Sequence, residues 1–274
     1  ITAKELIVEN AVASDKVYDG NTNAVISEAE LSGIIGEEVV SLGNHTSGVF
    51  AQANVGEDIA VTTAMTIAGA DAGNYTLVQP TALTADITTL ELTICGTFTV
   101  EDKIYDGTST ATIATNDLTL VTPVDGDDVS LTNVVAEFDS EVVGEGILVS
   151  ITAAELAGDD LENYSLSLVG APTTTATISA VTYTLTLVVS PKETGTVTGE
   201  GSYEESASVA ISATASSGYQ FVCWKNGETE VSTDASFSYT MPAENVTLTA
   251  YFEEIPAETF TVTFTITSDD LVPE

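Results

Sequence analysis

The stretch Lys16-Val-Tyr-Asp-Gly20 returns later in the chain as Lys103-Ile-Tyr-Asp-Gly107, and this recurrence decides the architecture. The two tyrosines lie 87 residues apart (105 − 18). A second pair of segments keeps nearly the same spacing, because Gly69-Ala-Asp-Ala-Gly-Asn-Tyr75 matches Gly158-Asp-Asp-Leu-Glu-Asn-Tyr164. Self-similarity at a fixed period indicates tandem modules. We therefore predict one module over residues 1–88 and a second copy over residues 89–180.

Short alternating runs fill both predicted modules. In Ser130-Leu-Thr-Asn-Val134 and Ile147-Leu-Val-Ser-Ile-Thr152, apolar residues alternate with polar ones. This period of two predicts strands with one buried face. Helical patterns are weak, although Ser27-Glu-Ala-Glu-Leu31 and Thr152-Ala-Ala-Glu-Leu156 could each form a single turn.

The pattern changes after Ile178. The large aromatic residues become frequent, and the only tryptophan, Trp224, lies here, so we predict a third β-module over residues 181–254 organised around Trp224. Phe260-Thr-Val-Thr-Phe-Thr-Ile266 resembles the strand expected at 182–189. We expect residues 255–274 to begin a further module or to form a C-terminal strand, and the chain to be a piece of a longer array.

Composition and charge exclude several classes of function. The 274 residues include 42 acidic residues against five lysines and no arginine, which gives a formal charge of −37. Nucleic acids and anionic lipid surfaces are bound through clustered Lys and Arg, so we expect neither as a partner. No apolar run reaches the 18 residues of a membrane span, so we expect no direct membrane insertion. We expect a monomeric chain.

The repeated motifs resemble those of a known family. The Lys-apolar-Tyr-Asp-Gly segments, Asn54-Val-Gly56 and Asp71-Ala-Gly-Asn-Tyr75 resemble the YDG repeat domain of bacterial surface proteins. The second copy departs from that pattern at Glu141-Val-Val-Gly144 and Asp160-Leu-Glu-Asn-Tyr164.

The third module is similar to the divergent internalin B-type repeat. The likeness rests on Gly195-Thr-Val-Thr-Gly199, Gly218-Tyr-Gln-Phe-Val-Cys-Trp224 and the closing Val246-Thr-Leu-Thr-Ala-Tyr-Phe252. Together the resemblances imply an all-β or β-dominated chain of three tandem modules in an elongated arrangement. They imply two Ig-like or β-grasp-like repeats followed by one β-grasp-like repeat.

We interpret the recurring motif residues as structural. A tyrosine followed by Asp-Gly suits a tight turn, in which the aspartate bonds nearby amides and the glycine takes a positive φ. A ligand-contacting loop is the alternative reading of the same residues. The residues assigned to structure are Tyr18, Asp19, Gly20, Asn74, Tyr75, Tyr105, Asp106, Gly107, Asn163, Tyr164 and Trp224.

Calcium is the one cofactor that the acidic loops bring into question. Candidate ligands are Asp125, Asp127 and Asp128 in one loop and Asp159 and Asp160 in another, although a solvated loop is the simpler reading of each. Asp19, Asn21, Asn23 and Glu30 also fall at ligand positions of an EF-hand-like loop, but Ala24 replaces the required glycine. We expect no cofactor.

Catalytic residue types are scarce. His45 is the only histidine and lies in a stretch without a partner pattern, while Cys95 and Cys223 fall in different modules. Carboxylate pairs of the kind used by glycosidases cannot be judged by counting. Lys16 and Lys103 hold equivalent positions, so an isopeptide crosslink stands beside the simpler reading of edge lysines that pair with carboxylates. We predict no catalytic residues and no enzyme.

The two resemblances imply a structural role at a bacterial surface. We expect non-enzymatic stalk repeats of an extracellular, adhesin-like protein, on the cell surface or secreted, that hold a functional domain away from the cell. The alternative is a module that binds a host glycan or protein. An exposed aromatic cluster in the third module would favour that alternative, and buried aromatics would favour the stalk.

Overall fold

The computed structural model describes residues 2–259, 261–263 and 265. The chain divides into two compact units, the first ending at Ser179 and the second beginning at Ala180. The β-dominated fold is confirmed, since the described elements are strands apart from two 3-10 turns, η1 (Ala72–Asn74) and η2 (Leu161–Asn163). Within these residues, no helix is long and apolar enough to span a membrane.

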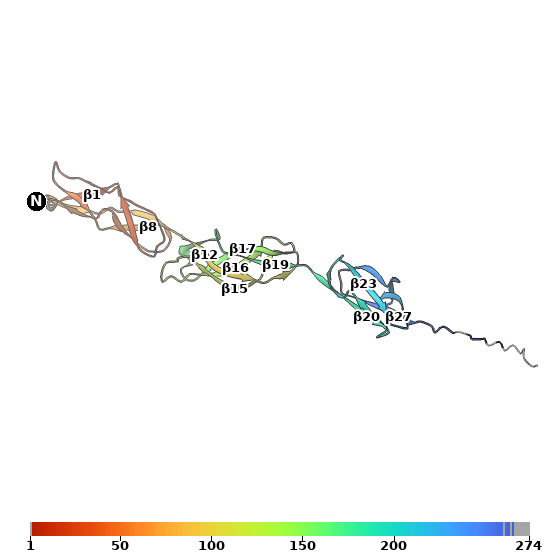
Figure 1. Ribbon diagram of the computed structural model, residues 1–274. Helices are drawn as coiled ribbons and strands as arrows, with labels where there is room; N and C mark the ends of the chain where they lie inside the picture. Colours follow the sequence, from red (N-terminus) through yellow and green to blue (C-terminus); the bar gives the residue numbers. More distant parts are fainter. Residues whose placement is uncertain (1, 260, 264, 266–274) are drawn as a thin grey trace, which may run out of the picture. The chain divides into compact units, whose positions relative to one another are not determined.

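Repeat 1 (residues 1–88) contains a three-stranded sheet, a six-stranded sheet and a strand pair. Figure 1 labels one strand of each of the two sheets, β1 and β8. The first sheet has the order β10 (Tyr75–Val78), β1 (Lys4–Glu9), β5 (Glu30–Ser32). The second has the order β2 (Val12–Ala13), β4 (Asn23–Ser27), β7 (Ser47–Phe50), β8 (Gly56–Thr63), β11 (Leu83–Thr88), β3 (Lys16–Val17). The pair joins β6 (Ser41–Gly43) and β9 (Thr66–Ala68).

Repeat 2 (residues 89–180) is built in the same way, with longer strands. Its first sheet has the order β15 (Ile113–Leu120), β12 (Leu90–Val100), β18 (Tyr164–Ser167). Its second has the order β13 (Lys103–Ile104), β19 (Thr173–Ser179), β17 (Gly144–Ala157), β16 (Ser130–Phe138), β14 (Thr110–Ala111).

Two parallel pairings fix which motif lies at which end of a repeat. The first strand of each repeat pairs with the strand that follows the Asn-Tyr segment, so Lys4 lies opposite Tyr75 and Leu90 opposite Tyr164. The last strand of each repeat pairs with the start of the Tyr-Asp-Gly segment, so Ile87 lies opposite Lys16 and Ile178 opposite Lys103. We call the Asn-Tyr end the head of a repeat and the Tyr-Asp-Gly end its tail.

The tail of repeat 1 meets the head of repeat 2 inside the first unit. A single residue, Thr89, separates β11 of repeat 1 from β12 of repeat 2. The core of repeat 1, which includes Phe50 and Ile87, is continuous with Leu92 and Tyr164 of repeat 2. Apolar burial therefore continues across the junction, and a separate cluster around Val149 forms the core of repeat 2.

The second unit packs two sheets over one core. The larger sheet has the order β22 (Gly201–Glu204), β20 (Thr182–Ser190), β27 (Val246–Glu254), β24 (Tyr219–Asn226), β25 (Thr229–Ser232). The smaller has the order β21 (Gly195–Thr198), β23 (Ser208–Ala215), β26 (Ser236–Thr240). Alternate residues of both sheets, among them Leu187 and Ile211, surround a fully buried Trp224.

Two local expectations differ from the structure. The helical turn considered at 152–156 is wrong, because these residues lie within β17 and pair with β16. The turn considered at 27–31 is also wrong, since β4 ends at Ser27 and β5 starts at Glu30. In both places strand pairing outweighs local helix propensity. The strand expected at 260–266 is not formed by residues 261–263 and 265, and its other residues lie outside the described ones.

Candidate functional site: the joint between the repeats

Lysine closes the Tyr-Asp-Gly turn in each repeat. The Lys16 Nζ lies 2.5 Å from the Asp19 Oδ1 and donates to the Asn21 carbonyl at 2.6 Å, and the ammonium group also lies over the Phe50 ring. Lys103 makes the corresponding contacts, with its Nζ 2.7 Å from the Asp106 Oδ1. The turn therefore carries its own cation, bound through charge-assisted hydrogen bonds.

The pKa values of the two turn aspartates reflect this lysine. Burial raises the pKa of Asp19, but the hydrogen bonds from Lys16 and the Asn21 amide outweigh it, and the pKa lies below its ordinary value. The hydrogen bonds from Lys103 and Thr108 lower the pKa of Asp106 to about 2. Both carboxylates are therefore ionised at neutral pH and hold the turn in shape.

One carboxylate joins the tyrosines of two different repeats. Tyr18, at the tail of repeat 1, donates its hydroxyl to the Asp127 Oδ2 at 2.8 Å, and Tyr164, at the head of repeat 2, donates to the same oxygen at 2.6 Å. The two rings meet edge to face, with centroids 5.5 Å apart and planes at 80°. Tyr18 and Tyr164 are only 5% and 6% exposed. The edge-to-face geometry is a favourable arrangement of two aromatic rings, and the hydrogen bonds to a carboxylate are stronger than those to a neutral acceptor.

Two further contacts cross the same joint. The Val55 amide of repeat 1 donates to the Asn163 Oδ1 of repeat 2 at 3.0 Å, and Asn163 is 4% exposed. Gly20 lies against Val124, where an added Cβ would come within 2.7 Å of the valine Cγ1. Gly20 also has a φ of +76°, which a residue with a side chain adopts at a cost. The glycine of the motif thus serves both the turn and the joint.

The joint alters the acidity of its tyrosines. Burial and the hydrogen bond to Asp127 raise the pKa of Tyr164 to about 12. The same two causes raise the pKa of Tyr18 further above its ordinary value. A phenolate beside the Asp127 carboxylate would place two negative charges together in a partly dry site, so the protonated form is favoured.

At the other ends of the repeats, two of the three equivalent residues are exposed, and the third, Tyr75, is covered within its own repeat at 6% exposure. Tyr105, the counterpart of Tyr18, is 45% exposed, and Asn74, the counterpart of Asn163, is exposed. Tyr75, the counterpart of Tyr164, accepts a hydrogen bond from the Ile35 amide and donates to Glu38 within its own repeat. Each motif residue is therefore present once inside the joint and once outside it.

Three of the five aspartates considered for calcium, Asp127, Asp128 and Asp160, have protein partners for their carboxylates. Asp127 accepts the two tyrosine hydroxyls, the Asp160 Oδ2 accepts the Asp128 amide at 2.8 Å, and the Asp128 Oδ2 accepts the Asp159 amide at 3.4 Å. The EF-hand-like loop holds the Lys16 ammonium beside Asp19 and Asn21. Across the part of the chain that the structure describes, no three His, Cys, Asp or Glu residues gather in a way that could hold a metal ion.

The residues considered for chemistry lie apart. His45 is exposed in a turn of repeat 1, Cys95 is exposed on β12, and Cys223 is buried in the core of the second unit. Lys16 and Lys103 contact oxygens of their own turns, three to seven residues away. A covalent bond over so short a span would close only a small loop and would constrain the unfolded chain little.

The sequence pattern does not indicate the residues that meet the motif residues across the joint. Asn54-Val-Gly56 is a repeat marker, but no pattern indicates that the Val55 amide donates to repeat 2. Asp127 and Val124 lie in a loop without a recurring motif, so nothing in the sequence distinguishes them from other acidic and apolar loop residues.

Comparison with known protein families identifies both kinds of module. The model of the YDG domain matches residues 2–83 and 88–175. The chain belongs to the YDG domain family. A second model, the divergent InlB B-repeat domain, matches residues 183–256. Both parts of the resemblance noted in the sequence are thereby confirmed, and YDG and InlB B-type repeats are typical of bacterial surface proteins. A search of curated proteins gave no match.

Proposed function

We propose that this pair of YDG domains and the module after it form a non-enzymatic spacer of an extracellular bacterial surface protein, which presents a functional domain away from the cell. The observation that carries the proposal is the joint. The residues that recur between the repeats, such as Tyr18 and Asn163, are used to hold one repeat against the next. A recurring motif with that use serves architecture.

The buried aromatics of the third module support the same role. Trp224 and Phe252 are 0% and 4% exposed, while Phe221, Phe237 and Tyr239 pack against the same core. Aromatic side chains used to bind a glycan or a protein stand at the surface. The aromatics in this module stabilise its two-sheet core, so the spacer is the reading that we favour over a binding module.

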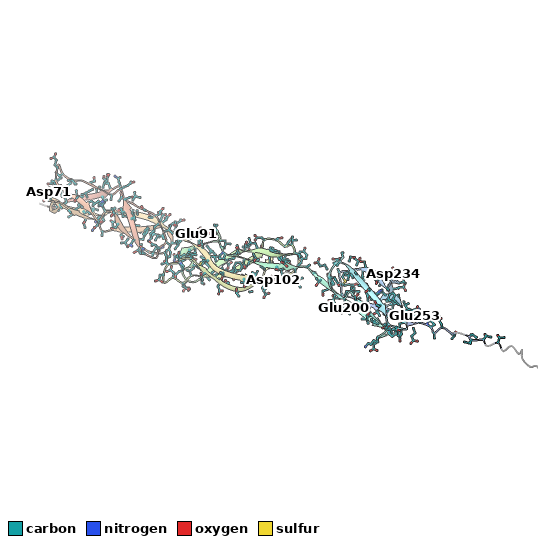
Figure 2. All side chains as sticks on the ribbon, in the orientation of Figure 1. Asp71, Glu91, Asp102, Glu200, Asp234 and Glu253 are labelled. Atoms are coloured by element: carbon teal, nitrogen blue, oxygen red, sulfur yellow. The ribbon has the colours of Figure 1, made fainter. Side chains whose placement is uncertain are left out.

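The charge of the chain suits a spacer. Figure 2 labels six acidic residues on both units, from Asp71 in repeat 1 to Glu253 in the third module, and their carboxylates are spread along the chain. A distributed negative field keeps neighbouring chains apart and in solution. It also supports the expectation of a monomer that does not bind nucleic acid.

The experiment that tests the spacer measures whether the joint holds the repeats in one arrangement. Spin labels on the exposed Cys95 of repeat 2 and on a His45→Cys variant of repeat 1 report the distance across the joint by pulsed electron paramagnetic resonance. We expect one narrow distance distribution, which broadens in Tyr18→Ala. A distribution that is equally broad with and without Tyr18 would show a flexible linkage and would contradict a spacer role.

A further inference from the structure

The head of repeat 1 repeats the surface that receives Tyr18 at the head of repeat 2. Tyr75 accepts the Ile35 amide at 3.0 Å, as Tyr164 accepts the Val124 amide at 3.0 Å. Tyr75 also donates to the Glu38 carboxylate, which holds the position of Asp127. The tyrosine, its amide donor and its carboxylate are thus all present a second time.

The rest of the receiving surface is also present. Each repeat has a three-residue 3-10 turn that ends in an asparagine, Asn74 in η1 and Asn163 in η2. An aspartate before each turn accepts an amide of the acidic loop: the Val39 amide donates to Asp71 and the Asp128 amide donates to Asp160, each at 2.8 Å. The two heads are therefore built to the same plan.

The two heads differ in what covers them. Asn163 is 4% exposed and accepts the Val55 amide, whereas Asn74 is exposed. Val124 packs against the core of repeat 1, whereas Ile35, its counterpart, is 55% exposed. A hollow of about 400 Å³ opens among residues that include Lys4, Ile35, Glu38 and Tyr75. At the head of repeat 1, Ile35 and Asn74 are thus exposed where their counterparts in repeat 2 are covered by repeat 1.

We propose that the head of repeat 1 binds the Tyr-Asp-Gly tail of another copy of the repeat within the same chain. In the complex, the incoming tyrosine donates to Glu38 and lies beside Tyr75. The incoming counterpart of the Val55 amide donates to the Asn74 Oδ1, and the incoming glycine lies on Ile35. The joint between repeats 1 and 2 already contains each of these contacts, so the proposal extends an observed interface to a surface with the same residue types.

One substitution distinguishes the two heads. Lys4 stands where repeat 2 has Leu90, which packs against the core at the joint. The Lys4 Nζ donates to the Gly33 carbonyl at 2.6 Å. Its aliphatic stem can cover apolar surface while the ammonium group stays hydrated. Lys4 can therefore still offer apolar surface to an incoming tail.

The test adds a copy of residues 1–86 ahead of the full chain, so that the added tail precedes Ile1 as the native tail precedes Ile87. Hydrogen exchange of the Val55 amide in the added copy is measured by nuclear magnetic resonance. Its exchange is expected to be at least about tenfold slower than in the same chain with Asn74→Ala in the original repeat 1, as expected for one buried hydrogen bond. Tyr18→Phe in the added copy should speed the exchange in the same way.

The native joint in the same molecule provides the control. The inference rests on the proposed spacer function, because both depend on the same kind of joint. Hydrogen exchange is therefore measured separately for the Val55 amide of the original repeat 1 and for that of the added copy. Slow exchange at both amides supports the proposal. Slow exchange at the original Val55 with fast exchange in the added copy overturns the proposal and leaves the spacer function standing. Fast exchange at both amides overturns the joint and the spacer function together.

Discussion

Tyr18→Phe is the smallest change that tests the joint, because it removes one hydroxyl and keeps the ring. Tyr105→Phe is its matched control, since the same substitution in the same motif falls on a tyrosine that is 45% exposed. Any effect of the substitution on the turn itself is common to both variants. The difference between them therefore isolates the contact with Asp127.

The expected loss of stability depends on the charge and the burial of the acceptor, Asp127. Hydrogen bonds to charged groups contribute about 1.5–3 kcal/mol, and exposed ones contribute less. Tyr18 is 5% exposed, but Asp127 is only half-buried and still accepts Tyr164 after the change, so the low end of the range applies. We expect Tyr18→Phe to lower the free energy of unfolding of the first unit by about 1.5 kcal/mol. Tyr105→Phe should change it by less than about 0.5 kcal/mol.

Urea unfolding followed by two signals gives the measurement. Far-ultraviolet circular dichroism reports all the strands, while tryptophan fluorescence reports the second unit alone, because Trp224 is the only tryptophan. With a urea slope of about 2 kcal/mol/M, the expected loss moves the midpoint of the first unit by about 0.7 M. The fluorescence midpoint should stay in place in both variants.

Two outcomes would refute this reasoning. Equal shifts for Tyr18→Phe and Tyr105→Phe would mean that the hydroxyl serves the turn and not the joint. A Tyr18→Phe effect that persists in an Asp127→Ala background would mean that Asp127 is not its partner, since a double-mutant cycle removes a shared contact only once.

Three further predictions test other parts of the account. Gly20→Ala should destabilise the first unit by about 1–3 kcal/mol more than Gly107→Ala in urea unfolding, because both glycines have nearly the same φ but only Gly20 faces Val124. Equal losses of stability in the two variants would mean that Gly20 serves the turn and not the joint. Because the pKa of Tyr164 is higher in the folded chain than the unfolded value of 10.0, its protonated hydroxyl contributes fully to stability below pH 10, and this contribution is lost as the pH rises to about 12. The urea midpoint should therefore fall over this pH range, and it should fall less in Tyr164→Phe. An equal fall in both proteins would contradict the raised pKa of Tyr164. The melting temperature should be the same in millimolar calcium and in chelator, and a rise with calcium would reinstate the acidic loops as metal sites.

The sequence predicts the repeats and their strands better than it predicts their contacts. Alternation around 130–134 and 147–152 marks strands that the structure contains as β16 and β17. The Tyr-Asp-Gly turn is equally visible, because glycine at positive φ and an aspartate that bonds a nearby amide leave a local signature. Periodicity and turn chemistry are local properties, and a single sequence reveals them.

The joint is not local, and for that reason it escaped prediction. Tyr18 and Asp127 are 109 residues apart, and Asp127 is one of 42 acidic residues. Its role depends on the parallel pairing of β12 with β18, which brings Tyr164 to the head of repeat 2. The sequence offers Asp127 only as a candidate calcium ligand or as part of a solvated loop, whereas in the structure its carboxylate accepts two tyrosine hydroxyls.

Hydrogen exchange of the Val55 amide in the unmodified chain tests the central claim most directly. This donor belongs to repeat 1 and its acceptor, Asn163, belongs to repeat 2. The account predicts a protected amide that exchanges at least about tenfold faster in Asn163→Ala and is unaffected by Asn74→Ala. A Val55 amide that exchanges freely in the unmodified chain, or that ignores Asn163→Ala, would contradict the claim that the recurring motif residues join one repeat to the next.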